Sequence, residues 1–259
     1  MVPPRGHVRA VTDGARVTLR AAAKLTLSLR VTGVRDDGYH LLDAEMVTLD
    51  VADEVRVEPG ASGITTSGPF AAGVPTGPDN LVARALVATG RLAGVHLVKH
   101  IPGGGGLGGG SADAAAILRW AGVRDLALAA SIGSDVPFCL VGGRARVRGI
   151  GEDVEPLEPV ELAFTLVVPP LAVSTPAVYR RWDELGGPTA DGPNDLEPAA
   201  LDVEPRLAGW RDRITALAGR SPVLAGSGAT WFVPGRRDDA LAPLRAEGAV
   251  VVATATGAA

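Results

Sequence analysis

The chain has 259 residues, of which 46% are hydrophobic and 21% are charged, and its formal net charge is −4. These values predict a globular protein with a core of its own, and they exclude collagen, coiled-coil and fully disordered chains. The charge argues against general binding to nucleic acid or to an anionic membrane, and the single cysteine, Cys139, excludes an internal disulfide and a cysteine-based zinc site.

The N-terminal segment has no apolar core of the length that a signal peptide needs. We expect the first 15 residues to form a disordered tail. The longest apolar stretch, around Leu162–Val173, is interrupted by Pro169 and Pro170 and is too short to span a membrane. These features predict a protein of the reduced cytoplasm, without a membrane partner.

A strand is predicted first, because Leu25, Leu27, Leu29 and Val31 alternate with polar residues. A turn at Asp36–Gly38 follows it. Further elements of the first half are predicted as strand pattern over 41–59, a helix from Leu81, a strand over Val95–Lys99, helices over Ser111–Trp120 and Leu126–Ile132, and a strand region over Phe138–Val147.

The second half repeats this mixture of strands and helices. Strands are predicted over Phe164–Val168 and Ala249–Ala253, a hairpin-like pair over Val223–Ala225 and Trp231–Val233, and helices over Thr175–Leu185, Asn194–Ala200, Leu207–Leu217 and Asp238–Glu247. The order lacks strict βαβ alternation and therefore favours an α+β fold in both halves. We expect a boundary near Glu158, which gives domains at 16–158 and 159–259.

The most informative segment is the run Gly103–Gly110, in which seven of eight residues are glycine. Glycine lets backbone N–H groups converge on one point, and a helix that begins directly after it adds its positive dipole end. The segment predicts a phosphate cradle, in which Ser111 caps the helix and offers its hydroxyl to phosphate or to Mg²⁺. It lacks the lysine of a Walker A motif and the context of a dinucleotide fingerprint. The alternative is a flexible linker before a helix.

Four other short segments are candidates for the functional site, and for each of them a purely structural role stays open. Lys24 lies beside three alanines that leave room for a ligand, although a solvated strand lysine fits as well. Asp135 could accept a proton from a hydroxyl, or it could be a turn or cap residue. The pair Tyr39–His40 suits a flat heterocycle but also fits a hairpin end. Leu224–Thr230 is either a tight turn or a second anion contact.

Taken in order, AAAKLTLSLRVTG with DGYHLL, PGGGGLGGGSADAAA, GSDVPF and LAGSGA resemble the motifs of the GHMP small-molecule kinases. The resemblance runs from about Arg20 to Ala253 and is greatest to the kinases of 4-diphosphocytidyl-2-C-methyl-D-erythritol in the non-mevalonate isoprenoid pathway. It implies a ribosomal protein S5 domain 2-like N-terminal domain, a ferredoxin-like C-terminal domain and an active site between them. The partners implied are ATP, Mg²⁺ and a cytidylyl substrate, bound by a monomer or homodimer.

The resemblance also implies a role for each matching residue. Asp135 would be the general base toward the substrate 2-hydroxyl, and Lys24 would lie beside it, hold it ionised and orient that hydroxyl. The residues implied around the ATP phosphates are Pro102, Gly103, Gly104, Gly105, Gly106, Leu107, Gly108, Gly109, Gly110, Ser111 and Ala112, with Asn80 and Lys99 near the adenine. On the substrate side they are Thr26, Tyr39, His40, Thr175, Tyr179, Gly226, Ser227 and Gly228, among which Tyr39 and Tyr179 would sandwich the cytosine and His40 would hydrogen-bond it.

The chain departs from the family pattern in two respects. The family has proline before the alanine-lysine pair and asparagine two residues after the lysine, where this chain has Ala22 and Thr26. The segments before Pro102 and before Asp135 are also shorter than the family's. Two alternatives therefore stay open: a GHMP kinase of another alcohol or sugar, and a nucleotide-binding homologue with weakened catalysis.

Overall fold

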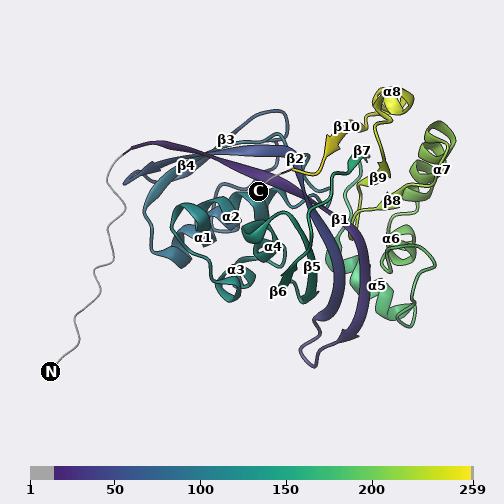
Figure 1. Ribbon diagram of the computed structural model, residues 1–259, viewed down its shortest axis with the longest axis horizontal. Coiled ribbons are helices and arrows are strands. Elements are labelled where there is room, and N and C mark those ends of the chain that lie inside the picture. Colours follow the sequence, from purple (N-terminus) through teal and green to yellow (C-terminus); the bar gives the residue numbers. More distant parts are fainter. Residues whose placement is uncertain (1–14, 258–259) are drawn as a thin grey trace.

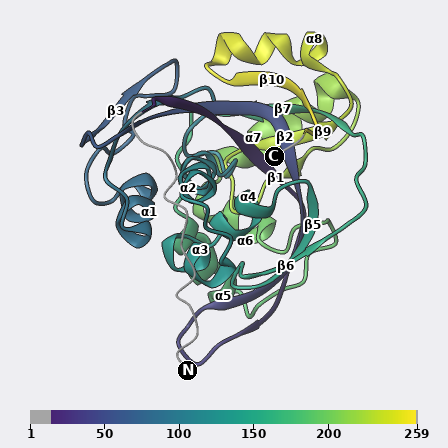
Figure 2. The same ribbon diagram turned by 60° about the vertical axis from the view of Figure 1, so that its left-hand side comes forward.

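The structure is a computed structural model that describes residues 15–257, and its longest feature is a hairpin of two strands (Figures 1 and 2). Strand β1 (Val17–Val34) pairs antiparallel with β2 (His40–Pro59) from Val17 opposite Val57 to Val34 opposite His40. The register shifts between Ala22 and Lys24, where such an irregularity bends the strand and re-aims its side chains. The tail predicted for the N-terminus lies outside the described residues, apart from Ala15.

The hairpin belongs to a six-stranded sheet in which β2 is central. Its order is β3-β4-β2-β5-β6, with β1 also paired to β2. The further elements of this half are β3 (Ile64–Ser67), α1 (Leu81–Thr89), β4 (Ala93–Val98), α2 (Gly109–Trp120), α3 (Leu126–Ile132), α4 (Val136–Val141), β5 (Arg144–Gly149) and β6 (Asp153–Pro156). Helix α2 packs on β1 and β2 and carries α1 and α4 beside it, so that these helices gather in one layer (Figures 1 and 2).

The second sheet has four strands in the order β10-β7-β9-β8. Its elements are β7 (Ala163–Val168), α5 (Thr175–Glu184), α6 (Glu197–Val203), α7 (Arg206–Ala218), β8 (Val223–Leu224), β9 (Trp231–Pro234), α8 (Asp238–Leu241), the 3₁₀ helix η1 (Ala242–Glu247) and β10 (Val250–Ala255). The sequence of strands and helices is the β-α-β-β-α-β pattern of ferredoxin-like folds. The predicted α+β class is therefore confirmed. The two sheets take their strands from either side of Glu158, and the division into two domains there stays a prediction.

One apolar cluster joins the two sheets. It contains Leu25 and Leu49 of the hairpin, Phe164 and Phe232 of the second sheet, and Leu107 of the glycine run. The two phenylalanine rings meet edge to face at 5.6 Å. Because burial of such side chains stabilises each by about 1.5–3 kcal/mol, this cluster holds the glycine loop at the junction of the sheets.

Two predicted elements are wrong in type or position. Residues 138–141 lie in helix α4 and not in a strand. Pro137 occupies its first turn, Gly142 ends it, and its residues from Val136 to Leu140 form an unbroken buried apolar run, a pattern that a short strand shares. Helix α6 begins at Glu197, three residues after the predicted start. Asn194 is instead a bridge, whose Nδ2 donates to the carbonyls of Leu224 and Gly226.

Candidate active site

Lys24 is a buried residue in the middle of β1, only 5% exposed, so its explanation as a solvated strand lysine is wrong. Its Nζ lies 3.3 Å from Asp135 Oδ2 and donates to Thr26 Oγ1 at 3.1 Å. Its backbone N–H donates to the Leu107 carbonyl at 3.0 Å, which ties the strand to the glycine loop. A buried amine with a carboxylate and a hydroxyl as neighbours is held in one place.

Asp135 stands directly before helix α4, in the N-cap position, but its side chain makes no capping hydrogen bond. The carboxylate is 32% exposed and faces the ammonium group of Lys24. Asp135 therefore lies in a turn at the N-cap position, as the alternative interpretation had it, but its side chain does not cap the helix. The predicted meeting of Lys24 with Asp135 is present. An exposed carboxylate oxygen beside a fixed cation can receive a proton from a bound hydroxyl.

The glycine run forms the wall of a cavity of about 550 Å³, which Pro102 and each residue of Gly103–Gly110 line. Gly104, Gly106 and Gly108 have φ of 71°, 76° and 70°, a conformation that other residues rarely adopt. A Cβ on Gly108 would lie 2.7 Å from Lys24 Cγ, and one on Gly106 would lie 2.8 Å from the Ala225 carbonyl oxygen. Glycine is thus required by close packing as well as by backbone conformation.

Helix α2 begins at Gly109 with Gly108 as its N-cap, so the prediction that Ser111 caps it is wrong. Gly108 has the left-handed conformation that glycine adopts without strain, and as a glycine it offers no side-chain cap. Ser111 lies in that first turn and lines a second cavity, of about 730 Å³. Ala112 is 1% exposed and lines neither cavity.

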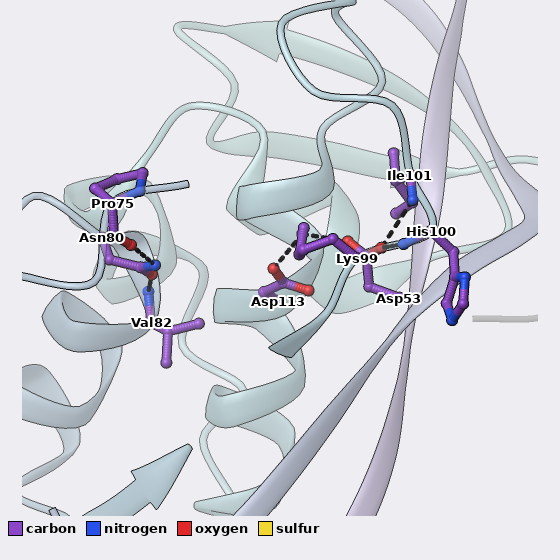
Figure 3. A network of polar contacts seen from close by, with 8 residues as sticks. All are labelled: Asp53, Pro75, Asn80, Val82, Lys99, His100, Ile101 and Asp113. Carbon is purple, nitrogen blue, oxygen red and sulfur yellow. Dashed lines mark hydrogen bonds and ion pairs between the residues drawn. The ribbon is translucent and has the colours of Figure 1, made fainter. Parts of the chain in front are cut away.

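Asn80 and Lys99 both line the first cavity, but their polar groups are engaged within the protein. Asn80 Oδ1 accepts from the Val82 N–H at 2.8 Å and so caps α1, while its Nδ2 donates to the Pro75 carbonyl (Figure 3). The Lys99 ammonium group contacts Asp53 and, at 2.5 Å, Asp113 Oδ2. Neither residue presents a free hydrogen-bonding head group to the cavity.

The Lys99 network was not predicted and ties down both ends of the glycine loop (Figure 3). Asp53 Oδ1, on β2, accepts the N–H groups of His100 and Ile101 at 2.5 and 2.8 Å, directly before the loop. Asp113, on α2, holds Lys99 from the other end of the loop. Burial and the neighbouring Asp53 raise the pKa of Asp113 to about 7, although Lys99 acts against them. Both carboxylates are fully buried.

The second cavity adjoins the first, because Leu81 and Gly106 line both. Lys24 and Asp135 lie in its wall, close to that border. The predicted substrate residues that line it are Thr26, Tyr39, His40, Thr175, Tyr179, Gly226 and Ser227. Gly228 is the exception, because it lies outside the lining and packs against Leu224 and Leu207. The Thr175 and Ser227 hydroxyls are 2.7 Å apart and join α5 to the turn after β8.

The far end of the second cavity is aromatic. The His40 ring lies 4.6 Å from the Tyr179 ring, between centroids, and meets Trp182 edge to face at 5.6 Å. Tyr39 is 56% exposed at the closed end of the hairpin, with the Arg35 guanidinium 5.9 Å from its ring centroid. The two tyrosines predicted to form a sandwich are therefore at one end of the cavity, and Tyr179 packs against His40.

The cysteine and the acidic residues of 15–257 offer neither a reactive thiol nor a metal cluster. Burial, and then the charge of Asp135, raise the pKa of Cys139 to about 12, so this thiol is no nucleophile. In this part of the chain no cluster of three His, Cys, Asp or Glu side chains could hold a metal ion. None of the helices described there is long and apolar enough to cross a bilayer.

Comparison with known proteins finds close relatives over most of the chain. A 4-diphosphocytidyl-2-C-methyl-D-erythritol kinase of Dinoroseobacter shibae is 43% identical over 244 residues, 82% of this chain and 83% of that one. The enzyme of the same name from Paracoccus denitrificans is 41% identical over 237 residues, 82% of this chain and 84% of its own. None of the protein-family models compared with the chain matches it.

Solved structures of kinases are similar to the chain as well. A crystal structure of 4-(cytidine 5'-diphospho)-2C-methyl-D-erythritol kinase is 36% identical, with a TM-score of 0.74, and the match covers 93% of this chain and 100% of that one. Homoserine kinase from Cytophaga hutchinsonii, at 18% identity and covering 98% of both chains, has a TM-score of 0.64. The second likeness shows the fold alone, and together the two confirm the predicted GHMP kinase fold.

Proposed function

The chain belongs to the 4-diphosphocytidyl-2-C-methyl-D-erythritol kinase family, and we propose which side chains of its site carry that family's reaction. The reaction is phosphoryl transfer from ATP to the 2-hydroxyl of 4-diphosphocytidyl-2-C-methyl-D-erythritol, a step of the non-mevalonate route to isoprenoids. The observation that carries the assignment is the 3.3 Å approach of Lys24 Nζ to Asp135 Oδ2 where the two cavities adjoin. We assign the first cavity to ATP and the second to the alcohol.

Asp135 is the general base in this proposal. Its carboxylate takes the proton of the substrate hydroxyl as that oxygen bonds to the γ-phosphorus, and the bond from the γ-phosphorus to the β,γ-bridging oxygen breaks to release ADP. The position fits because the carboxylate is exposed to the second cavity and makes no cap hydrogen bond that would turn it away. General bases of this kind contribute about 10²–10⁴-fold to rate.

Lys24 holds the Asp135 carboxylate in place and opposes the negative charge of the reacting groups. Phosphoryl transfer depends mainly on positioning and charge, so a fixed ammonium group at this place supplies much of what the reaction needs. Thr26 stands where the family has asparagine, and its hydroxyl accepts a hydrogen bond from Lys24. It therefore holds the amine directly, which supports a working site and not a degraded one.

The glycine loop binds the triphosphate through its backbone N–H groups and the start of α2. Asn80 and Lys99 line this cavity and hold neighbouring segments of the chain in place, because their polar groups bind other parts of the protein. The residues also fit a nucleotide-borne Mg²⁺, since Mg²⁺ on phosphates keeps several waters and needs one or two protein groups. Ser111, in the first turn of α2 directly after the loop, would offer its hydroxyl. When bound, Mg²⁺ neutralises phosphate charge.

The aromatic end of the second cavity takes the cytosine. Tyr179 and Tyr39 supply ring faces for stacking, and His40 a hydrogen-bonding edge. Thr175, Ser227 and Gly226 line the side between base and reacting hydroxyl. The domains of this proposal are 16–158, which holds the ATP cavity, and 159–259.

The test is an assay of ADP release with ATP and purified 4-diphosphocytidyl-2-C-methyl-D-erythritol. The proposal predicts ADP release that depends on this alcohol, and little with mevalonate, homoserine or galactose as acceptor. Equal turnover of an acceptor without a nucleobase would favour a broader GHMP kinase. ATP binding without transfer to any acceptor would mean a nucleotide-binding homologue.

A further inference from the structure

A histidine and an aspartate from distant parts of the chain meet at the aromatic end of the second cavity. His40 is the first residue of β2, and its Nε2 lies 2.8 Å from Oδ1 of Asp183, on α5. Both residues line the cavity, and the His40 side chain is 11% exposed. The ring is held from two further sides by Tyr179 and Trp182.

The Trp182 contact is itself fixed. The indole N–H of Trp182 donates to the Pro188 carbonyl at 2.9 Å, and Trp182 is 7% exposed. The His40 ring therefore has little freedom to turn over and exchange its two nitrogens. Packing fixes the orientation of the ring, and the hydrogen-bond partners of its two nitrogens determine which nitrogen carries the proton.

The contact with Asp183 decides which nitrogen carries the proton. An ionised carboxylate only accepts hydrogen bonds, so Nε2 of a neutral ring must donate and carry the hydrogen. The lone pair is then on Nδ1. Within the described residues Nδ1 has no hydrogen-bond partner, and it is not among the buried unpaired atoms, so it is accessible to a ligand of the cavity that His40 lines.

We propose that Asp183 is a positioning residue that fixes the Nε2–H tautomer of His40 and thereby makes the second cavity prefer a cytosine to a uracil base. Cytosine presents an amino group at its 4-position, which an acceptor can bind, whereas uracil presents a carbonyl oxygen there. An accepting Nδ1 pairs with the first and repels the second. The inference rests on the proposed function, because it needs the base to lie at His40.

The first experiment needs no substrate and uses the full chain. A long-range ¹H–¹⁵N spectrum of the histidine rings, recorded at about pH 8.5, distinguishes the tautomers. The chain has only four histidines, and the spectrum of His40→Gln identifies the His40 signals. We expect the Nε2–H form in the wild type and a mixture of tautomers in Asp183→Asn. A wild-type ring protonated at Nδ1, alone or with Nε2, overturns the proposal.

The second experiment measures kcat/KM with the cytidylyl substrate and with its uridylyl analogue. We expect Asp183→Asn to lower the preference for cytosine about tenfold, since an asparagine can also donate to Nε2. Asp202→Asn is the matched control. Asp202, on α6, is 47% exposed, as is Asp183, and it pairs with Arg181 of α5, the helix that carries Asp183. Asp202 lies outside the cavity lining. Its preference should stay that of the wild type.

The two possible failures can be told apart. If the wild type phosphorylates the cytidylyl substrate and Asp183→Asn keeps the full preference, the role of Asp183 is wrong and the proposed function stands. If the wild type phosphorylates neither nucleotide substrate, the proposed function is wrong, and with it the preference for a base. The tautomer measured by NMR then still decides whether Asp183 fixes the ring.

Discussion

Replacement of Lys99 by methionine tests the buried network that holds the glycine loop. The substitution keeps the length of the side chain and removes the one cation between Asp53 and Asp113, which are 0% and 1% exposed. Both carboxylates contact the same Nζ, so their oxygens lie within about 5 Å of each other, and two unit charges at that distance repel by about 3 kcal/mol at an effective dielectric constant of about 20. Lys99→Met should therefore unfold more easily, and Asp113→Asn should rescue it.

The assay is urea unfolding of Lys99→Met and of Lys99→Met/Asp113→Asn at two pH values. Near pH 8 the double variant should be more stable by about 3 kcal/mol, because it lacks the second charge. Near pH 5 the gain should fall to about 1.5 kcal/mol or less, because in Lys99→Met one of the two carboxylates can then take up a proton and remove the repulsion. Protonation about one pH unit above the ordinary pKa of an aspartate costs about 1.4 kcal/mol. The sign follows from the raised pKa of Asp113: the folded state binds the proton, so stability falls as pH rises toward 7. Equal stability of both variants at both pH values would refute the reasoning.

Three further predictions concern the loop, the base and the thiol. Gly108→Ala should lower kcat at least about tenfold more than Gly104→Ala, because the new Cβ displaces Lys24 at 2.7 Å whereas one at Gly104, at the same φ, meets nothing within 4 Å; steady-state kinetics of the two variants decide this. Tyr179→Ala should raise KM for the cytidylyl substrate, because the loss of one base-stacking ring weakens binding by about 1–3 kcal/mol. An unchanged KM would show that Tyr179 does not belong to the base site. Cys139 should react with a thiol reagent only after unfolding, as it is 7% exposed and its pKa is raised to about 12, and rapid labelling of the native protein would contradict this.

The fold could be predicted wherever local pattern and burial agree. The alternation of Leu25, Leu27, Leu29 and Val31 predicts β1 correctly, although Lys24 and Thr26 on the opposite face are buried as well. Leu126–Ile132 is the helix α3 that was predicted. The pattern fails at 138–141, where the apolar run is buried without a break up to Leu140 and period two cannot be told from period 3.6.

The site could be predicted in part, because its motifs are local. The glycine run, Lys24 and Asp135 each lie in a short segment of unusual composition, and their order along the chain gives them meaning together. Asp53 could not be found in this way, since an aspartate in a strand next to a glutamate has the pattern of a solvated residue. Its role depends on contacts with Lys99 and Ile101, more than forty residues away in sequence.

Asp183 was missed for the same reason, although it is close in sequence to the predicted Tyr179. Nothing near it indicates that α5 will bring it to His40, 143 residues earlier in the chain. Long-range pairs of ordinary polar residues leave no local signal, and a structure is needed to find them.

The central claim is that Asp135 takes the proton of the acceptor hydroxyl beside Lys24. The most direct measurement is kcat of Asp135→Asn with ATP and 4-diphosphocytidyl-2-C-methyl-D-erythritol, together with the Kd of each ligand. The account predicts a fall in kcat of at least about 100-fold, with both Kd values within about threefold of the wild type, because the amide keeps the shape and loses the base. Near-normal turnover by Asp135→Asn would contradict it.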